Sequence, residues 1–179
     1  MNIDNIHTMV FDFDGVFTDN KVYVSETGLE LVRCDRGDGL AINMLQSACK
    51  GKAVDIFILS TEANPVVLAR AKKLKLECVH GCNNKLAHLK ERLSSRFNNI
   101  KQALSGVVYL GNDLNDFEVM RAVGYSYAPT DAHEKIKSIA TQVLPKKGGE
   151  GFVREFVERF FWVSEESTLS DEVINLIKE

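Results

Sequence analysis

The sequence has no long hydrophobic run, no surplus of basic residues and no dense set of cysteines. No apolar stretch approaches the roughly 20 residues that a membrane-spanning helix needs. The first residues show neither the basic region nor the apolar region of a signal peptide. Lysine and arginine number 22 against 25 acidic residues, so the net charge of −3 argues against nucleic acid as a partner. We therefore expect a cytoplasmic protein that binds neither membranes nor nucleic acids.

Four cysteines are present, Cys34, Cys49, Cys78 and Cys82, and a chain of 179 residues can bury a core without disulfides. We expect reduced thiols. Cys78 and Cys82 flank a histidine, but a second ligand pair at zinc-site spacing is missing, which disfavours zinc. The composition, 45% hydrophobic and 26% charged, is that of a globular domain. We expect one domain over 1–162 and a C-terminal tail, 163–179, with a short helix.

Short apolar strands alternate with helical patterns along the chain. Strands are expected near 6–12, 53–59, 76–79, 107–110, 125–128 and 142–144. Helices are expected from residue 38 onward and over 65–73, 83–93, 114–122, 132–139 and 152–161, with a loop at 94–99. Two β-rich runs around Gly28 predict a hairpin at about 20–34. The alternation predicts right-handed βαβ crossovers and an α/β fold with a mostly parallel sheet.

Two aspartates end the first apolar strand. Asp12 and Asp14 are two residues apart on an extended chain, so they project to the same side, and Gly15 then breaks the strand. The carboxyl end of a strand is where open α/β sheets place their chemistry. Two carboxylates this close repel each other unless a cation lies between them, and Mg²⁺ suits an all-oxygen site. A solvated surface turn is the simpler alternative.

Further polar residues follow later strands in a fixed order. Ser60 ends the second strand of the expected sheet, where its hydroxyl could bond a phosphoryl oxygen or merely cap a helix. Lys85 opens a helix, where it could neutralise a phosphoryl group or be a solvated charge. The string Gly-Asn112-Asp113-Leu-Asn-Asp116 could be a helix cap. Alternatively, Asp113 completes a Mg²⁺ shell, with Asn112 in support and Asp116 orienting Lys85 or a water.

The string from Asp12 to Asp19, D-F-D-G-V-F-T-D, resembles the first motif of the haloacid dehalogenase-like phosphatases, and the order of the later residues is similar to that family's remaining motifs. The resemblance implies a Rossmann-like three-layer sandwich in which the hairpin stands in place of a cap domain. It also implies that Asp12 is the nucleophile, forming an aspartyl-phosphate, and that Asp14 is the general acid and base. The Mg²⁺ ligands would be Asp12, the backbone carbonyl of Asp14, and Asp113.

The resemblance narrows toward the 3-deoxy-octulosonate 8-phosphate phosphatases and covers residues about 5–162. It rests on chain length, the hairpin, and the string K-K-G-G-E-G-F-V-R-E-F-V that begins at Lys146. That family forms tetramers in which hairpins and C-terminal segments of neighbouring subunits help to close each active site. The resemblance therefore implies a homotetramer. Gly148 and Gly149 could form a strap that contacts substrate, or a simple loop before a helix.

The second motif departs from the octulosonate pattern T-G-R and reads Ser60-Thr61-Glu62. Glu62, with Arg70 and Lys73 on the next helix, is similar to the branch that hydrolyses 2-keto-3-deoxy-nononate 9-phosphate or N-acylneuraminate 9-phosphate. Arg70 and Lys73 could pair with a sugar-acid carboxylate, and Thr61 and Glu62 with its polar groups. The alternative is that these are solvated helix charges.

We therefore expect a Mg²⁺-dependent phosphomonoesterase that acts on a nine-carbon sugar-acid phosphate. The octulosonate phosphatase itself is the alternative of the same class. A phospho-receiver domain fits less well, because its phosphorylated aspartate lies on a later strand than its acidic pair. A catalytically inactive oligomerisation module of sialic-acid activation is the remaining alternative, and modules of that kind tend to lose motif acids that this chain retains.

Overall fold

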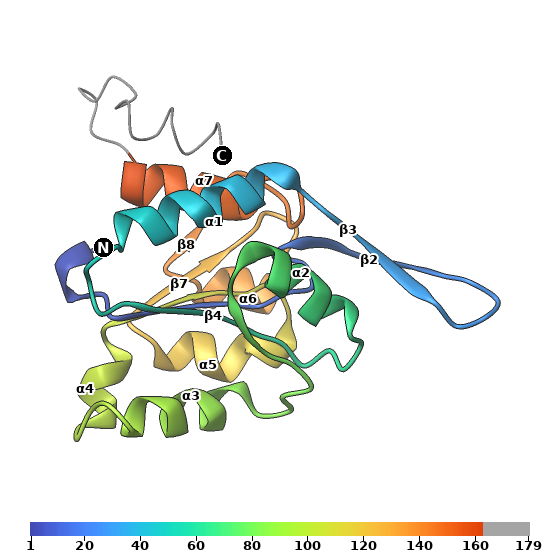
Figure 1. Ribbon diagram of the computed structural model, residues 1–179. Coiled ribbons are helices and arrows are strands. Elements are labelled where there is room, and N and C mark those ends of the chain that lie inside the picture. Colours follow the sequence, from blue (N-terminus) through green and yellow to red (C-terminus); the bar gives the residue numbers. More distant parts are fainter. Residues whose placement is uncertain (163–179) are drawn as a thin grey trace.

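A six-stranded sheet forms the centre of the molecule in the computed structural model, which describes residues 1–162 (Figure 1). The strands lie in the order β5-β4-β1-β6-β7-β8, and every neighbouring pair is parallel. Their bounds are Thr8–Phe11 (β1), Asp55–Leu59 (β4), Glu77–Val79 (β5), Val107–Leu110 (β6), Tyr125–Ala128 (β7) and Gln142–Val143 (β8). The predicted α/β fold with a parallel sheet is confirmed.

The first strand lies in the middle of this sheet. β1 pairs with β4 on one side and with β6 on the other, with Phe11 opposite Ile58 and Leu110. All four residues of β1 are buried, which explains why Met9, Val10 and Phe11 are consecutive apolar residues rather than an alternating pattern. The strand order changes direction at β1, and such a switch point opens a crevice at the carboxyl end of the strand.

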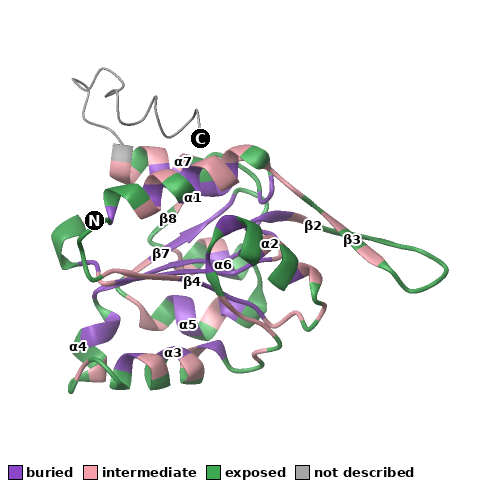
Figure 2. Ribbon diagram, in the orientation of Figure 1, coloured by how far each residue is buried: buried purple, intermediate pink, exposed green. Residues whose placement is uncertain are grey.

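Helices cover both faces of the sheet, as Figures 1 and 2 show. One face carries α1 (Arg36–Ala48), α2 (Val66–Leu74) and α7 (Phe152–Val157), and the other carries α3 (Lys85–Ser94), α4 (Ile100–Leu104), α5 (Phe117–Ala122) and α6 (Glu134–Ile139). Each helical layer encloses its own apolar cluster against the sheet. Burial of these two clusters supplies the main driving force for folding.

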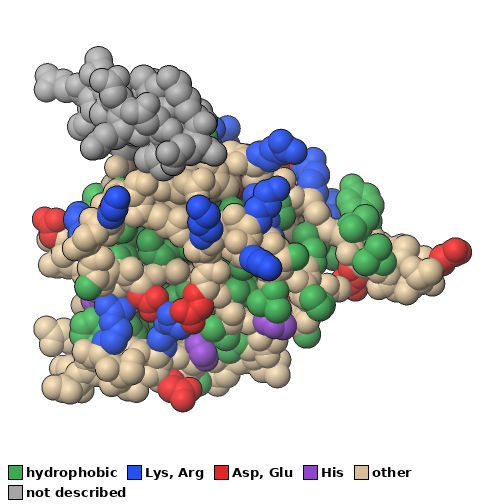
Figure 3. Space-filling view, viewed as in Figure 1, with side chains coloured by type: hydrophobic (Ala, Val, Ile, Leu, Met, Phe, Trp, Pro, Cys, Tyr) green, Lys and Arg blue, Asp and Glu red, His purple; other side chains and the backbone are tan. Residues whose placement is uncertain are grey.

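The hairpin β2–β3 is separate from this core. Its strands, Thr18–Val24 and Glu30–Cys34, form an antiparallel two-stranded sheet that projects away from the helices and the central sheet (Figure 1). Its apolar side chains are mostly exposed, as the space-filling view shows (Figure 3). More than half of the surface is accessible in each of Val22, Tyr23, Val24, Leu29 and Leu31.

Several element boundaries differ from the prediction. α1 begins at Arg36, two residues early, because the Asp35 side chain accepts the Gly37 N–H and caps it. α4 was not expected, and Asn99 caps it inside a short polar connection. The single helix expected at 152–161 is instead α7 followed by a π-helical turn, Glu158–Trp162. The predicted tail helix lies outside the described residues, and within them no helix is long and apolar enough to cross a membrane.

Candidate active site

The predicted site residues meet at the carboxyl edge of the sheet. Asp12 follows β1, Ser60 follows β4, and Asn112 follows β6, the three strands that lie side by side. A pocket of about 410 Å³ opens there. Its lining residues are Asp12, Asp14, Asn20, Thr61, Asn112, Asp113, Leu114 and Asn115. A larger hollow of about 670 Å³ lies at the opposite edge, between His7 and Phe97, but no acidic or basic side chain lines it apart from His7.

The loop after β1 is shaped by one glycine and one threonine. Gly15 has φ of +73°, and a Cβ at this position would overlap the side chain of Asn112, so only glycine fits. The Thr18 hydroxyl donates to Asp14 Oδ1 at 3.3 Å and accepts the Gly15 N–H at 3.2 Å. The turn therefore brings the second aspartate back over the strand end.

The buried ammonium group of Lys85 forms ion pairs with both Asp12 and Asp116. Lys85 is the first residue of α3, which Asn84 caps by accepting the Ala87 N–H. Its Nζ lies 2.7 Å from Asp12 Oδ1 and 2.7 Å from Asp116 Oδ1, and the side chains of the lysine and both acids are at most 3% exposed. We call Asp12, Lys85, Asp116 and Tyr109 the Lys85 cluster, since Tyr109 also contacts Asp116.

Asp116 is held by four donors. Its Oδ1 accepts from Lys85 Nζ at 2.7 Å and from the Tyr109 hydroxyl at 2.7 Å. Its Oδ2 accepts the backbone N–H of Asn112 at 2.9 Å and that of Asp113 at 3.4 Å. A carboxylate offers about four lone-pair directions, so all of them are used. Asp116 is thus fixed as a buried anchor for Lys85 and for the loop after β6.

Burial and charge shift the pKa values of the three central groups in ways that suit their positions. Burial raises the pKa of Asp12 well above its usual value, and so does the nearby charge of Asp116, while Lys85 and the Phe13 N–H oppose this rise. Burial disfavours the charged form of Lys85, but Asp12 and Asp116 outweigh it and raise its pKa. Burial also raises the pKa of Asp14, which favours a carboxyl group that can hold a proton.

The second-motif residues lie beside this cluster. Ser60 is buried, and its hydroxyl oxygen accepts the Glu62 N–H at 3.0 Å, which leaves the O–H proton available to a ligand. The Thr61 hydroxyl accepts from Asn115 Nδ2 at 3.0 Å and lines the pocket. Glu62 Oε1 accepts the Asn64 N–H at 2.7 Å, and the Glu62 charge contributes to the raised pKa of Asp14. Thr61 and Glu62 therefore lie close to the acids.

Arg70 and Lys73 do not line the pocket with the aspartates. They line a second hollow of about 390 Å³, which shares no lining residue with the first. Arg70 donates from its guanidinium to the Asp35 carbonyl at 2.9 Å, and Gly39 leaves room for the guanidinium beside α1. Within one chain, the structure therefore separates the two cations expected to bind a substrate carboxylate from the acids expected to do the chemistry.

The donor set at the pocket fits a hard cation. Among the described residues, no group of three His, Cys, Asp or Glu side chains could hold a metal. The predicted shell, however, needs a backbone carbonyl from Asp14 besides side chains. Asn112 Oδ1 is buried in the pocket lining without a hydrogen-bond partner in the described chain. Asp113 is exposed, and its carboxylate accepts the Leu114 N–H as a helix cap. The oxygens of Asp12, Asp14 and Asn112 therefore suit Mg²⁺.

The glycine-rich segment before α7 packs on the loop that follows the first aspartate. Gly149 donates its N–H to the Val16 carbonyl at 3.1 Å, and Gly148 donates to Asp131 Oδ1 at 3.0 Å. A Cβ at Gly148 would overlap the backbone of Gly15. The predicted strap thus touches the loop after Asp12 in its own chain, backbone against backbone.

Sequence reasoning missed Tyr109. It reads as one apolar member of the strand Val107–Leu110, and the sequence gives no sign that its hydroxyl points into a polar cluster. It also missed that Asn112 Oδ1, in the lining of the pocket beside Asp113, is a buried acceptor without a hydrogen-bond partner among the described residues. The only available signal was the period of the strand, which places Tyr109 on the opposite face of the sheet from Val108 and Leu110.

Comparison with known proteins agrees with this geometry. A family model described as haloacid dehalogenase-like hydrolase matches residues 42–156. The 3-deoxy-D-manno-octulosonate 8-phosphate phosphatase KdsC of Yersinia pestis is 33% identical over 152 residues, which are 84% of this chain and 77% of that protein. A solved structure from Streptomyces avermitilis, assigned to the HAD family hydrolases, aligns with a TM-score of 0.81 at 36% identity over 96% of this chain and 94% of its own.

A third similar protein is the 3-deoxy-D-manno-octulosonate 8-phosphate phosphatase of Moraxella catarrhalis, solved in complex with magnesium ion, phosphate ion and KDO. It shares the fold, with a TM-score of 0.79 at 24% identity over 98% of this chain and 95% of its own. The chain belongs to the haloacid dehalogenase-like hydrolases, and the predicted family is confirmed. Within that family, its similarity to named phosphatases is to those of the octulosonate type.

Proposed function

We propose that the chain is a Mg²⁺-dependent phosphatase that hydrolyses the phosphomonoester of a sugar acid through an aspartyl-phosphate on Asp12. The observation that carries this proposal is the buried Lys85, whose ammonium lies 2.7 Å from Asp116 and 2.7 Å from Asp12, an acid that lines the pocket. Phosphoryl transfer needs an in-line nucleophile and neutralisation of charge, and these groups supply both. The relatives support the same reaction class.

In this mechanism the Asp12 carboxylate attacks phosphorus, and the bond from phosphorus to the ester oxygen breaks. Asp14 gives its proton to the leaving oxygen, then takes a proton from a water molecule that attacks the aspartyl-phosphate. Inorganic phosphate leaves and both carboxyl groups return to their first state. Lys85 and the Ser60 hydroxyl stabilise the transferring oxygens.

Mg²⁺ would be held by a carboxylate oxygen of Asp12, the carbonyl of Asp14 and the side-chain oxygen of Asn112. When bound, it supplies positive charge that reduces repulsion between the anionic nucleophile and the anionic phosphoryl group. Asn112 is preferred to Asp113 as the third ligand, because its Oδ1 is a buried acceptor without a partner while Asp113 caps a helix. An unpaired buried acceptor is costly unless a ligand satisfies it.

For the substrate, the relatives favour 3-deoxy-D-manno-octulosonate 8-phosphate over the nine-carbon acids expected from the second motif. The separation of Arg70 and Lys73 from the acidic pocket points the same way. A nine-carbon sugar-acid phosphate remains a second candidate on one observation. Glu62 lies near Asp14 at the position where the octulosonate pattern has arginine.

We further propose that the chain assembles as a homotetramer through its hairpin. An isolated two-stranded hairpin is marginally stable in water, yet this one exposes a row of apolar side chains, Val22, Tyr23, Val24, Leu29 and Leu31. Coverage by a second copy would stabilise it and could close a neighbouring pocket. Light scattering on the purified chain gives the subunit number, and a monomer at all concentrations would contradict this part of the proposal.

Phosphate release tests the function. The octulosonate 8-phosphate, the nononate 9-phosphate and N-acetylneuraminate 9-phosphate are compared with Mg²⁺ and with a chelator, with an aryl phosphate as a reference. We expect the octulosonate to lead by about 100-fold in kcat/KM, a difference of about 2.7 kcal/mol. A higher kcat/KM for one of the nine-carbon acids would instead identify a nine-carbon sugar-acid phosphate as the substrate. No release from any ester would contradict the phosphatase itself.

A further inference from the structure

Tyr109 places a single hydroxyl group in an otherwise apolar layer. The residue lies on β6 and is completely buried. It belongs to the apolar cluster on the α3–α6 side of the sheet, together with Val10, Phe57, Leu89 and Val119. Its hydroxyl nevertheless has one well-formed contact, to Asp116 Oδ1 at 2.7 Å. Phenylalanine would fill the same volume without a buried polar group, so the hydroxyl calls for an explanation.

The accepting atom of this hydrogen bond is the one that also holds the catalytic ammonium. Asp116 Oδ1 accepts from Tyr109 and from Lys85, both at 2.7 Å, and Lys85 in turn reaches Asp12 Oδ1 at 2.7 Å. Four polar groups thus form one continuous chain from β6 to the nucleophile. Such a chain transmits a change at one end to the other, because each bond polarises the next.

We propose that Tyr109 is a positioning residue that keeps the Lys85 ammonium divided between Asp116 and Asp12. Its hydroxyl occupies one lone-pair direction of Asp116 Oδ1 and draws negative charge away from it. Without that bond, Asp116 would attract Lys85 more strongly, and the ammonium would move away from Asp12 and the phosphoryl oxygens. This inference rests on the proposed phosphatase function.

The hydroxyl is suited to be a permanent donor. Burial raises the pKa of Tyr109 well above its usual value, and the charges of Asp116 and Asp12 act in the same direction. The phenol therefore keeps its proton at neutral pH. The buried ring places the oxygen beside Asp116 Oδ1, a carboxylate atom that can only accept, so the hydroxyl donates to it.

The matched control is Tyr127 on the adjacent strand β7. It too is a buried tyrosine in the same sheet, 2% exposed, but among the described residues its hydroxyl reaches only the Met1 sulfur, at 3.7 Å. Tyr109→Phe and Tyr127→Phe thus remove the same atom from neighbouring strands. Only the first removal touches the Lys85 cluster, so a difference in catalysis between them is not a general effect of losing a buried hydroxyl.

Steady-state phosphate release is measured for the wild type and both variants with the substrate that the wild type prefers. Thermal unfolding provides the check on folding. For Tyr109→Phe we expect kcat to fall about 10-fold with KM within about twofold of the wild type, because the shifted ammonium matters most in the transition state. Tyr127→Phe should keep kcat within about twofold. Equal kcat values for the two variants would overturn the proposal.

A double variant separates positioning from packing. In an Asp116→Asn background, adding Tyr109→Phe should lower kcat by less than about twofold, since the hydroxyl acts through the carboxylate. A full 10-fold loss there would overturn the proposal. If Tyr109→Phe does not fold, Asp116→Asn is measured instead, because it weakens the hydrogen bond between Tyr109 and Asp116 at its acceptor. A raised KM with unchanged kcat in Asp116→Asn would overturn the proposal. A wild type that hydrolyses no ester removes the proposed function, and with it any role for Tyr109 in positioning.

Discussion

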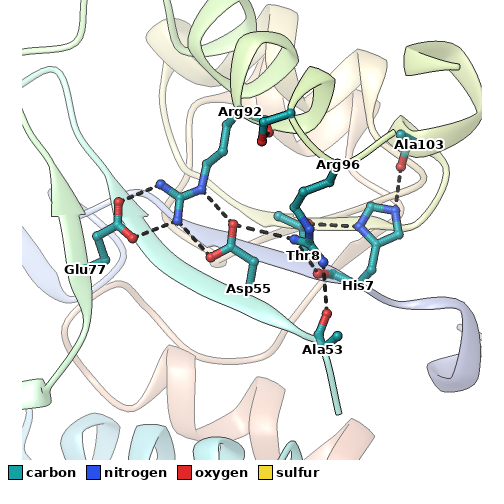
Figure 4. A network of polar contacts seen from close by, with 9 residues as sticks. His7, Thr8, Ala53, Asp55, Glu77, Arg92, Arg96 and Ala103 are labelled. Carbon is teal, nitrogen blue, oxygen red and sulfur yellow. Dashed lines mark hydrogen bonds and ion pairs between the residues drawn. The ribbon is translucent and has the colours of Figure 1, made fainter. Parts of the chain in front are cut away.

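Two ionic networks lie at opposite edges of the same parallel sheet, and in each a central cation bonds two carboxylates; in one of them Arg96 also lies 3.8 Å from the carboxylate of Asp55. At the amino edge, Arg92 of α3 forms paired hydrogen bonds of 2.6 and 2.9 Å with Asp55 at the start of β4, and of 2.5 and 2.7 Å with Glu77 at the start of β5 (Figure 4). Its guanidinium also lies 4.2 Å from the centre of the Phe57 ring. We call Arg92, Asp55 and Glu77 the Arg92 network.

The two networks differ in exposure and in geometry. In the Arg92 network the side chains are 23%, 21% and 56% exposed, so water shares each charge. In the Lys85 cluster every charged side chain is at most 3% exposed. A planar guanidinium binds two carboxylates through forked contacts, whereas an ammonium is a point charge that can turn toward a third anion. The Arg92 network therefore suits a link between α3, β4 and β5, whereas the ammonium of the Lys85 cluster suits contact with an anionic ligand.

The largest expected effect is that of Asp12→Asn, which replaces the carboxylate of the proposed nucleophile with an amide of the same shape. We expect turnover to fall by about 10⁴-fold or more, because an amide cannot form the covalent intermediate. Circular dichroism and thermal unfolding should report a folded protein. A variant that retained most of its phosphate release would show that another group attacks phosphorus.

Removal of the cation from the Lys85 cluster comes next. Lys85→Met leaves two carboxylates buried without their partner, so we expect a loss of about 3–5 kcal/mol in the free energy of unfolding. Phosphate release should fall by about 10²- to 10³-fold. Urea unfolding and steady-state kinetics measure the two losses. Lys85→Met with normal turnover would mean that the cluster is structural, like the Arg92 network.

The metal ligands give a third and more moderate test. Asn112→Ala removes the unpaired acceptor from the pocket, and we expect Mg²⁺ binding, followed by calorimetry, to weaken about 10-fold or more. Asp113→Ala is the matched control at the next position and should change Mg²⁺ affinity by less than about twofold. If Asp113→Ala weakened Mg²⁺ binding more than Asn112→Ala did, Asp113 and not Asn112 would be the third Mg²⁺ ligand.

The sequence predicted the sheet and the order of the motifs because both follow from local patterns. A buried strand such as β1 needs a continuous apolar run, and Asp12 at its end lies at the switch point of any such sheet. What it could not predict depends on side-chain direction. A turn leaves Asn112 Oδ1 buried without a partner while Asp113 caps a helix, and a ring orientation lets Tyr109 bond Asp116, and no spacing rule specifies either.

A third buried carboxylate, that of Asp38, differs from those in both networks, because it has no ion-pair partner among the described residues. Asp38 of α1 accepts the Arg154 N–H at the start of α7, its Oδ2 has no partner in the described chain, and burial raises its pKa to about 7. The folded state therefore binds a proton more tightly than the unfolded state does. Stability contributed by this proton is present at about pH 4 and is lost as pH rises through 7.

Asp38→Asn removes this titration, so the variant should gain stability relative to the wild type as pH rises. The expected gain between pH 4 and pH 8 is on the order of 3 kcal/mol in the free energy of unfolding. Urea unfolding of both proteins at pH 4.5, 6 and 8 measures it. A constant difference across these pH values would show that Asp38 titrates normally in the folded protein.

The smallest effect is expected for the Arg92 network. Arg92→Met keeps much of the aliphatic contact with Phe57 but removes the forked bonds, and partly exposed ion pairs contribute little. We expect a loss of about 1–2 kcal/mol in the free energy of unfolding at low salt, a smaller loss in high salt, and unchanged kcat. Reduced turnover would show that the two edges of the sheet are coupled.

The central position of β1 has a consequence for how the enzyme is made. Its strand partners are Asp55–Leu59 and Val107–Leu110, and Gly149 donates to the loop that follows β1. During synthesis, Asp12 is therefore made before the strands that flank β1 and before the Gly149 segment that contacts its loop. Chains that stop before Gly149 lack the segment that seats this loop, so incomplete products of translation should have no phosphatase activity.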